Sequence, residues 1–262
     1  WSIRNSTTHP LFLYFSEPLS GGIDFALRRV EAWLLWLPWP VLAAAVFLLA
    51  QKAANLRLAL LTTFCLLFMG LVGLWEESMQ TLALMAVSVL ISLLIGIPLG
   101  IWAARNEAVE RGLRPFLDAM QTMPAFVYLL PVVLFFGIAR VPSVVATVIY
   151  ALPPAIRLTT LGIREVDPEV VEAARSFGAT SRQILLRVQL PLALPTIMAG
   201  VNQPIMMALG FVVIAAMIGA GGLGGVVLDS LRSLRVGLAL EAGLAIVFLA
   251  VLLDRLSEAL SE

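Results

Sequence analysis

The chain is 262 residues long, 60% of its residues are hydrophobic and 13% are charged, and its acidic and basic residues balance. The charged share is about half the average for soluble proteins, and a water-soluble fold of this size cannot bury so much apolar surface, so the composition predicts an integral membrane protein. A single His, Cys and Lys (His9, Cys65 and Lys52) exclude a multi-histidine zinc site, a CxxC motif, a phosphate-binding loop and an imidazole-activated serine. We therefore expect no metal site, cofactor or catalytic site in this chain; if ATP is used, another subunit binds it.

The expected elements begin with an external N-terminal tail at residues 1–32, whose last part begins an amphipathic helix, expected over 22–35, in the outward membrane interface. Seven apolar runs follow, each close to the roughly 20 residues that cross a bilayer as a helix. Two peripheral spans fall within residues 33–75, five spans fall within residues 76–258, and a cytoplasmic tail follows at 259–262. The seven runs are 33–50, 58–75, 78–104, 119–139, 141–163, 192–218 and 236–253. The sequence thus predicts an all-α membrane protein with about seven transmembrane helices.

The distribution of basic residues predicts the orientation, because positively charged loops resist translocation. Eleven Lys and Arg residues fall in one set of alternating loops and six in the other. The richer set contains the loop at residues 164–191 and should be cytoplasmic. We therefore expect the N-terminus and residues 219–235 outside, and the C-terminus in the cytoplasm.

The loop at residues 164–191 has the pattern of two short helices joined by a glycine. Asp167, followed by a proline and a glutamate, combines a capping carboxylate, a proline at the first helical position and an acid at the positive end of the helix dipole. Gly178 suits the left-handed position that ends a helix, and a second short helix is expected over 180–190. The first helix should have one apolar face, made of Val170, Ala173, Ala174 and Phe177. A compact, capped body of this kind can transmit force to a soluble partner.

The same loop carries a family motif. Glu-Ala-Ala at 172–174 is followed by three residues and Gly178, then by nine residues and Val188, and then by one residue and Leu-Pro. This pattern resembles the EAA loop of permease subunits in binding-protein-dependent ABC importers, written EAA-x3-G-x9-I-x-L-P, with Val188 where Ile is usual. Other segments look like the glycine betaine/proline betaine branch of these permeases, and the resemblance covers roughly residues 70–258. These segments are 117–138, 151–163, 190–203 and 219–224.

The resemblance implies the type I ABC importer permease fold, with a core at residues 76–258, in a bacterial inner membrane. The implied partners are two ATP-binding subunits, a second permease copy forming a homodimer, an extracytoplasmic solute-binding protein and membrane lipid, with no nucleic acid. The loop is then the coupling element that docks on the ATP-binding subunit. The residues implied to dock are Glu172, Ala173, Ala174, Ser176, Phe177, Gly178 and Arg182. The alternative is an amphipathic hairpin resting on lipid, with Glu172 paired to Arg175.

Aromatic and polar residues within the spans are candidates for the translocation path, since aromatic faces attract a quaternary ammonium cation. The candidates are Phe126, Tyr128, Phe135, Phe136, Tyr150, Asn202, Gln203, Met206, Met207 and Phe211. The alternatives are packing against lipid or the core and, for the two amides, hydrogen bonds between helices. Glu241 is the one acid inside an expected span, where a functional role and an interfacial salt bridge are equally good interpretations.

The glycine-rich run at residues 219–225 predicts a tight outward-facing turn or re-entrant segment in which backbones approach closely. Its members Gly221, Gly222, Leu223 and Gly224 are candidates for an external gate or for a contact with the binding protein. The sequence does not decide between these two roles.

The cargo implied by the resemblance is a small quaternary ammonium or methylamine solute of the glycine betaine, choline, carnitine, proline betaine or trimethylamine oxide type, and the process is osmoprotection. Methionine, phosphonate and sulfonate permeases share the EAA loop and are the alternative. An ion-coupled secondary transporter is more remote, because such proteins carry paired intramembrane acids or inverted repeats, and the sequence shows neither.

Overall fold

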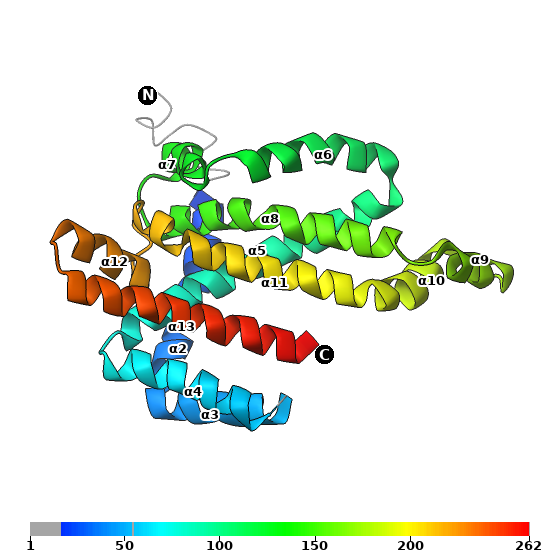
Figure 1. Cartoon of the computed structure of the whole chain (residues 1–262). Helices are drawn as coiled ribbons and strands as arrows, with labels where there is room; N and C mark the ends of the chain where they lie inside the picture. Colours follow the sequence, from blue (N-terminus) through cyan, green and yellow to red (C-terminus); the bar gives the residue numbers. More distant parts are fainter. Residues whose placement is uncertain (1–16, 54, 262) are drawn as a thin grey trace.

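The computed structural model describes residues 17–53 and 55–261, and within them every regular element is a helix. The predicted all-α class is therefore confirmed. In chain order the elements are α2 (Glu17–Trp36), α3 (Trp39–Ala53), α4 (Leu56–Leu71), α5 (Trp75–Arg105), α6 (Glu107–Thr122), η2 (Ala125–Tyr128), α7 (Leu129–Phe136), α8 (Arg140–Arg164), α9 (Pro168–Ser176), α10 (Ser181–Ile184), η3 (Leu185–Gln189), α11 (Leu190–Ala216), α12 (Gly222–Arg232) and α13 (Val236–Ser261). The long helices lie side by side, with α9 and α12 at opposite ends of the bundle (Figure 1).

Among the described residues, four helical stretches are long and apolar enough to span a bilayer: α5, α8, the continuous stretch Ser181–Ala216, and α13. Two bent pairs raise the number to six if each pair crosses as one unit. The predicted run at 58–75 corresponds to α4, which has 16 residues and is shorter than a usual span. The architecture therefore agrees with about seven expected spans, and two of the expected runs are sharply bent rather than straight.

The core of the bundle is a close association of α5, α8 and α11. A Cβ at Gly96 or at Gly100 of α5 would lie 2.6 Å from a side-chain carbon of α8, so these glycines allow the two helices to touch. Hydroxyl groups bridge the helices: Ser92 Oγ donates to the carbonyl of Val148 at 3.3 Å, and Thr160 Oγ1 donates to the carbonyl of Gly100 at 3.1 Å. Small residues and interhelical hydrogen bonds are the usual basis of helix association in membranes, where apolar burial supplies no driving force.

The helices α3, α4 and α13 form a second group at one side of the bundle (Figure 1). Asn55 caps α4 by accepting a hydrogen bond from the amide of Leu58 at 2.9 Å. Phe248 of α13 packs edge-on against Phe64 and Phe68 of α4, with ring centroids 5.6 and 4.8 Å apart. The side of this group that faces away from the core is covered by exposed apolar side chains, among them Leu48, Leu49, Leu60, Leu61, Leu240 and Val247.

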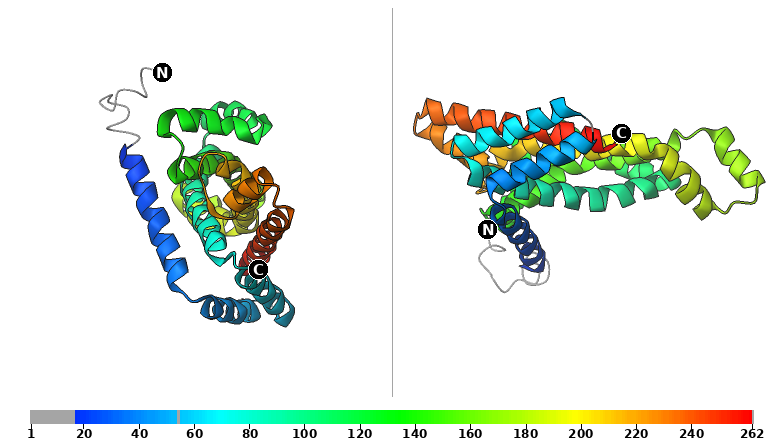
Figure 2. Two further views of the ribbon diagram at one scale, coloured as in Figure 1. Left: turned by 90° about the vertical axis from the view of Figure 1, so that its left-hand side faces the viewer. Right: turned by 90° about the horizontal axis from the view of Figure 1, so that it is seen from below.

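Helix α2 lies across the bundle rather than along it (Figure 2), and the chain turns by 94° between α2 and α3. Ile23, Leu27 and Leu34 are buried against the core, whereas Phe25 and Trp33 are exposed. This amphipathic helix was predicted over 22–35, and the structure begins it at Glu17. The predicted span at 33–50 begins only at Trp39, because Pro38 stands at the break between the helices. The part of the predicted tail before Glu17, including His9, lies outside the described residues.

The predicted continuous span over 119–139 is wrong. Helix α6 ends at Thr122, Met123 is extended with φ −70° and ψ 136°, and the chain turns by 115° before α7. Pro124 explains the break, because a residue that precedes proline is pushed out of the helical region. The charged residues 107–118, which fall between two of the expected spans, are part of a regular helix that runs beside α8 (Figure 1).

Candidate coupling loop and translocation face

The first helix of the predicted coupling loop has the expected ends. Asp167 accepts a hydrogen bond from the amide of Glu169 at 2.8 Å, with Pro168 at the first position of α9. At the other end Gly178 has φ +81° and donates to the carbonyl of Arg175 at 2.8 Å, while the next amide donates to the carbonyl of Ala174 at 3.1 Å. This pair of bonds is a Schellman motif, so the left-handed glycine ends the helix as predicted.

The second half of the loop differs from the expected short helix. It begins as predicted, with a reciprocal capping box between Thr180 and Gln183. It does not stop before Pro191, because residues 185–189 form a π-helical turn that continues directly into α11. The amide of Leu190 donates to the carbonyl of Leu185, and this wider turn accommodates the proline that follows. The loop is therefore rigidly continuous with a spanning helix on its C-terminal side.

Helix α9 projects beyond the end of the bundle (Figures 1 and 2), and none of its residues is buried. Phe177 is 92% exposed, and Val170 is 40% exposed on the same apolar face. Val171 on the other side packs against a buried cluster that includes Val166 and Leu185. Glu172, Ala173, Ser176, Gly178 and Arg182 are also exposed, and Ala174 is half-buried. Within the described part of the chain no ion pair joins Glu172 to Arg175, which removes the contact proposed for a lipid-bound hairpin.

Helix α6 presents a polar face beside the apolar helix α8. It is strongly amphipathic, with Leu117 buried toward the bundle, and it carries five charged residues between Glu107 and Asp118, beside an exposed Phe116. Asp118 pairs with Arg157 of α8, and Glu110 pairs with Arg164 at the end of α8. A cavity of about 360 Å³ lies between α6 and α8 beside these pairs. A helix with this surface cannot lie against hydrocarbon, so the α6 side must face water or protein.

The interhelical ion pairs were missed by sequence reasoning, although Arg157 was visible as a charge inside an apolar run. Three ion pairs between described residues join different helices, and in each of them the arginine belongs to α8. The third joins Arg140 to Glu31 of α2 at 2.7 Å. The signal that could have found them is the presence of acids at helical spacing in residues 107–118, just before an arginine-bearing span.

Three of the candidate path aromatics meet where η2, α8 and α11 converge. Tyr150 lies edge-on to Tyr128, with ring centroids 5.7 Å apart, and stacks on Phe211 at 5.0 Å. Tyr128 and Phe211 are buried, and the hydroxyl of Tyr128 donates to the carbonyl of Met120 at the end of α6. Phe126, which is 60% exposed, does not join this cluster.

The remaining path candidates are divided between two environments. Asn202 on α11 is half-buried, and its Oδ1 atom has no hydrogen-bond partner among the described residues. Gln203 and Met206 are exposed, Met207 is half-buried, Phe135 is 44% exposed, and Phe136 packs against the core. Glu241 of α13 is exposed and makes no ion pair with any described residue. The structure therefore brings together only part of the predicted path set.

The glycine run forms the predicted tight turn, and it packs against α5. Gly221 and Gly222 have φ +72° and +61°, and a Cβ at Gly222 would lie 2.4 Å from Thr81 Oγ1. The amide of Leu223 donates to that same oxygen at 2.9 Å. A Cβ at Gly224 would lie 2.5 Å from the carbonyl oxygen of Val212. Leu223 is fully buried, so its side chain is not available to an external partner in this structure.

The family comparison matches the C-terminal part of the chain, which holds most of these features. Residues 96–262 match the family described as "Binding-protein-dependent transport system inner membrane component". The chain belongs to this family. It is an integral membrane permease subunit of a binding-protein-dependent ABC importer, a family that works with an ATPase and a substrate-binding protein.

Two curated relatives and one solved structure show how far the similarity extends. The "Glycine betaine/proline betaine transport system permease protein ProW" of Escherichia coli is 50% identical over 92% of this chain and 68% of its own length. The "Glycine betaine transport system permease protein OpuAB" of Bacillus subtilis is 46% identical over 93% of this chain and 86% of its own. A chain of the inward-facing MetNI methionine ABC transporter matches with TM-score 0.65 and 22% identity over 72% of this chain and 94% of that one. The last match shows the shared permease fold.

Proposed function

We propose that this permease forms the membrane path for a small quaternary ammonium or methylamine solute, and that α9 couples the path to ATP hydrolysis in a partner subunit. The observation that carries the cargo class is the identity of 46 to 50%, over more than nine-tenths of this chain, to two permeases named for glycine betaine. The methionine alternative is supported only at the level of the fold. Tyr150, which is half-buried and packs against the buried Tyr128 and Phe211, adds an aromatic ring of the kind that attracts a quaternary cation.

The proposed orientation places α9 in the cytoplasm of a bacterial inner membrane, with α12 and the N-terminus outside. The excess of basic residues on the α9 side supports this orientation, and α9 and α12 lie at opposite ends of the bundle. Phe177 and Val170 would then present an exposed apolar surface to the ATPase subunit. ATP and Mg belong to that subunit in this proposal, and this chain has no catalytic role of its own.

The partner across the α6 and α7 side is proposed to be a second copy of this chain. Phe126, Leu130, Leu134 and Ile138 recur every four residues and are all more than half exposed. Irregular backbone at Met123 and Gly137 lies at the two ends of the helical segment 125–136 that carries most of these residues. Such backbone does not face lipid at membrane depth, because its freed polar groups need protein or water. A homodimer places this apolar stripe against its symmetry mate and the polar face of α6 along the path.

The cargo is tested with the permease, its ATPase and its solute-binding protein reconstituted in proteoliposomes. We expect ATP hydrolysis to rise when the binding protein is loaded with glycine betaine, and radiolabelled glycine betaine to accumulate inside. Stimulation by methionine or a sulfonate alone would contradict the proposed cargo and favour the alternative.

The coupling role is tested with Gly178→Val. Gly178 has a positive φ, at which a β-branched residue is a steric outlier, so valine should re-aim the second half of the loop. We expect an inserted, assembled complex that has lost uptake and no longer raises ATP hydrolysis in response to loaded binding protein. The matched control is Gly112→Val in α6, which has open space and an ordinary φ. Normal uptake by Gly178→Val would show that the loop is only a surface hairpin and has no coupling role.

A further inference from the structure

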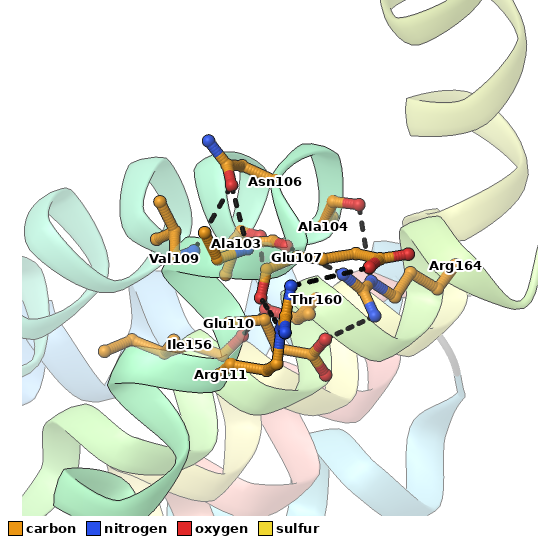
Figure 3. A network of polar contacts seen from close by, with 12 residues as sticks. Ala103, Ala104, Asn106, Glu107, Val109, Glu110, Arg111, Ile156, Thr160 and Arg164 are labelled. Atoms are coloured by element: carbon orange, nitrogen blue, oxygen red, sulfur yellow. Dashed lines mark hydrogen bonds and ion pairs between the residues drawn. The ribbon is translucent and has the colours of Figure 1, made fainter.

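Arg164 occupies the junction of three elements (Figure 3). It is the last residue of α8, and three residues separate it from the first residue of α9. Its Nη2 atom donates to the carbonyl of Ala103 at 3.1 Å, its Nε atom donates to the carbonyl of Ala104 at 3.3 Å, and its Nη1 atom pairs with Glu110. One guanidinium therefore holds the end of α5, the beginning of α6 and the approach to the coupling helix.

Each of these contacts has a physical reason. The last carbonyls of a helix have no intrahelical partner and carry the negative end of the helix dipole, so a cation from α8 satisfies them at the end of α5. Asn106 alone separates α5 from α6, and its side chain caps α6 by accepting from the amides of Ala108 and Val109 at 2.9 and 3.3 Å. The α5–α6 corner is therefore tight, and Arg164 holds it from both sides with a planar group that offers several donors.

The segment between α9 and Arg164 is tightly packed. Val166 lies between α8 and α9, and it is buried with Ile163 and Leu185 in the cluster at the base of the loop. Val171 of α9 packs on the same cluster. A displacement of α9 must therefore move the end of α8 with it, because packed side chains transmit strain rather than absorb it.

The far end of α6 carries the displacement toward the aromatic cluster. The carbonyl of Met120, in the last turn of α6, accepts the hydroxyl hydrogen bond of Tyr128. Tyr128 in turn contacts Tyr150. The contacts between α9 and the cluster are thus continuous through Arg164, Glu110 and the length of α6.

We propose that Arg164 is a positioning residue of the transport cycle, which ties the α5–α6 corner to the end of α8 so that movement of the coupling helix α9 is passed to α6. This inference rests on the proposed function, because it assumes that α9 is the element moved by the ATPase. It assigns to Arg164 and Glu110 a role that the family motif at 172–191 does not contain.

Two conservative substitutions test the proposal in the reconstituted complex. Glu110→Gln removes the ionic contact to α6 and leaves the bonds from Arg164 to α5 in place. Arg164→Lys keeps the charge, but a lysine cannot reach three acceptors in the same way. The matched control is Glu107→Gln, which breaks the exposed pair between Glu107 and Arg111 within α6 (Figure 3).

We expect both test variants to assemble with the ATPase at normal stoichiometry and to hydrolyse ATP at the basal rate. Uptake, and the stimulation of ATP hydrolysis by loaded binding protein, should fall about fivefold, within the range of coupling changes produced by residues that contact no ligand. The double variant should show no further loss, because both changes cut the same link. The control should behave as the unsubstituted complex.

Two results would overturn the proposal. Normal stimulation and uptake in both variants would show that Arg164 only caps α5. A fall in uptake that is fully explained by a smaller amount of assembled complex would show that Arg164 only stabilises the fold. Failure of the unsubstituted complex to respond to loaded binding protein is a separate outcome, and it counts against the proposed function itself.

Discussion

Helices α4 and α6 are alike in length and in the way they begin, and they differ in surface. Each has 16 residues, and each is capped by an asparagine, Asn55 for α4 and Asn106 for α6. After Arg57 the helix α4 has no charged residue, and its outward side exposes Leu60 and Leu61. The surface of α6 carries acids and arginines along most of its length and pairs two of its acids with α8.

This difference identifies the two sides of the molecule. An uncharged, Leu-rich surface suits hydrocarbon, and a charged helix surface at membrane depth requires water or a protein partner. The α3, α4 and α13 group therefore suits lipid, and we propose that α6 with α7 forms the side that faces the path and the second permease copy.

The largest effect is expected from placing a charge on the lipid side. Leu60→Arg should cost about 3 kcal/mol of insertion free energy, because an exposed leucine is replaced by a charge that lipid cannot solvate. Ala119→Arg on the exposed surface of α6 should be tolerated. The amount of each variant inserted in isolated membranes tests this difference. Equal amounts of Leu60→Arg and Ala119→Arg would contradict it.

The next effect concerns the close contact of α5 with α8. A Cβ at Gly100 would lie 2.6 Å from a side-chain carbon of Thr159 and 2.8 Å from the carbonyl oxygen of Ile156. Gly100→Ala should therefore separate the helices and cost about 1 to 3 kcal/mol of stability. Gly112→Ala in α6 has open space and should be neutral or slightly stabilising. Thermal unfolding of the purified permease in detergent measures the stability of both variants. A lower midpoint for Gly112→Ala than for Gly100→Ala would contradict the close α5–α8 contact.

The smallest effect is expected at the pair between Asp118 and Arg157, which are both more than a third exposed on their side chains. Asp118→Asn should change overall stability by less than about 1 kcal/mol. It should nevertheless speed hydrogen exchange in the backbone of α6, because the pair helps to hold this helix against α8. Asp229→Asn in α12 removes an exposed pair within one helix and should leave α6 unchanged. Identical exchange in α6 for the two variants would show that the pair contributes nothing there.

Local rules predicted the coupling loop almost completely. The cap at Asp167 and the end at Gly178 depend on the conformational preferences of single residues, which the sequence displays directly. The continuation of the second helix through the π turn into α11 was not predicted, because Pro191 is a strong local stop signal and packing of the neighbouring helices overrides it.

The translocation face was predicted much less well. Hydropathy averages over a window, so the charged residues 107–118 fell between two expected spans, although they are part of a regular helix. Which candidates meet is decided by contacts between distant segments, and only Tyr128, Tyr150 and Phe211 of the aromatic set converge. Composition could suggest these residues, but it could not pair them.

The central claim, that α6 faces water and α4 faces lipid, is tested most directly by cysteine labelling of the assembled complex in membranes. The buried Cys65 is replaced by alanine, and a water-soluble maleimide is added to Ala119→Cys or to Leu61→Cys. Maleimide reacts with the thiolate, which forms readily only where water reaches the side chain. The account predicts rapid labelling at residue 119 and almost none at residue 61. Protection of residue 119 to the same extent as residue 61 would contradict it.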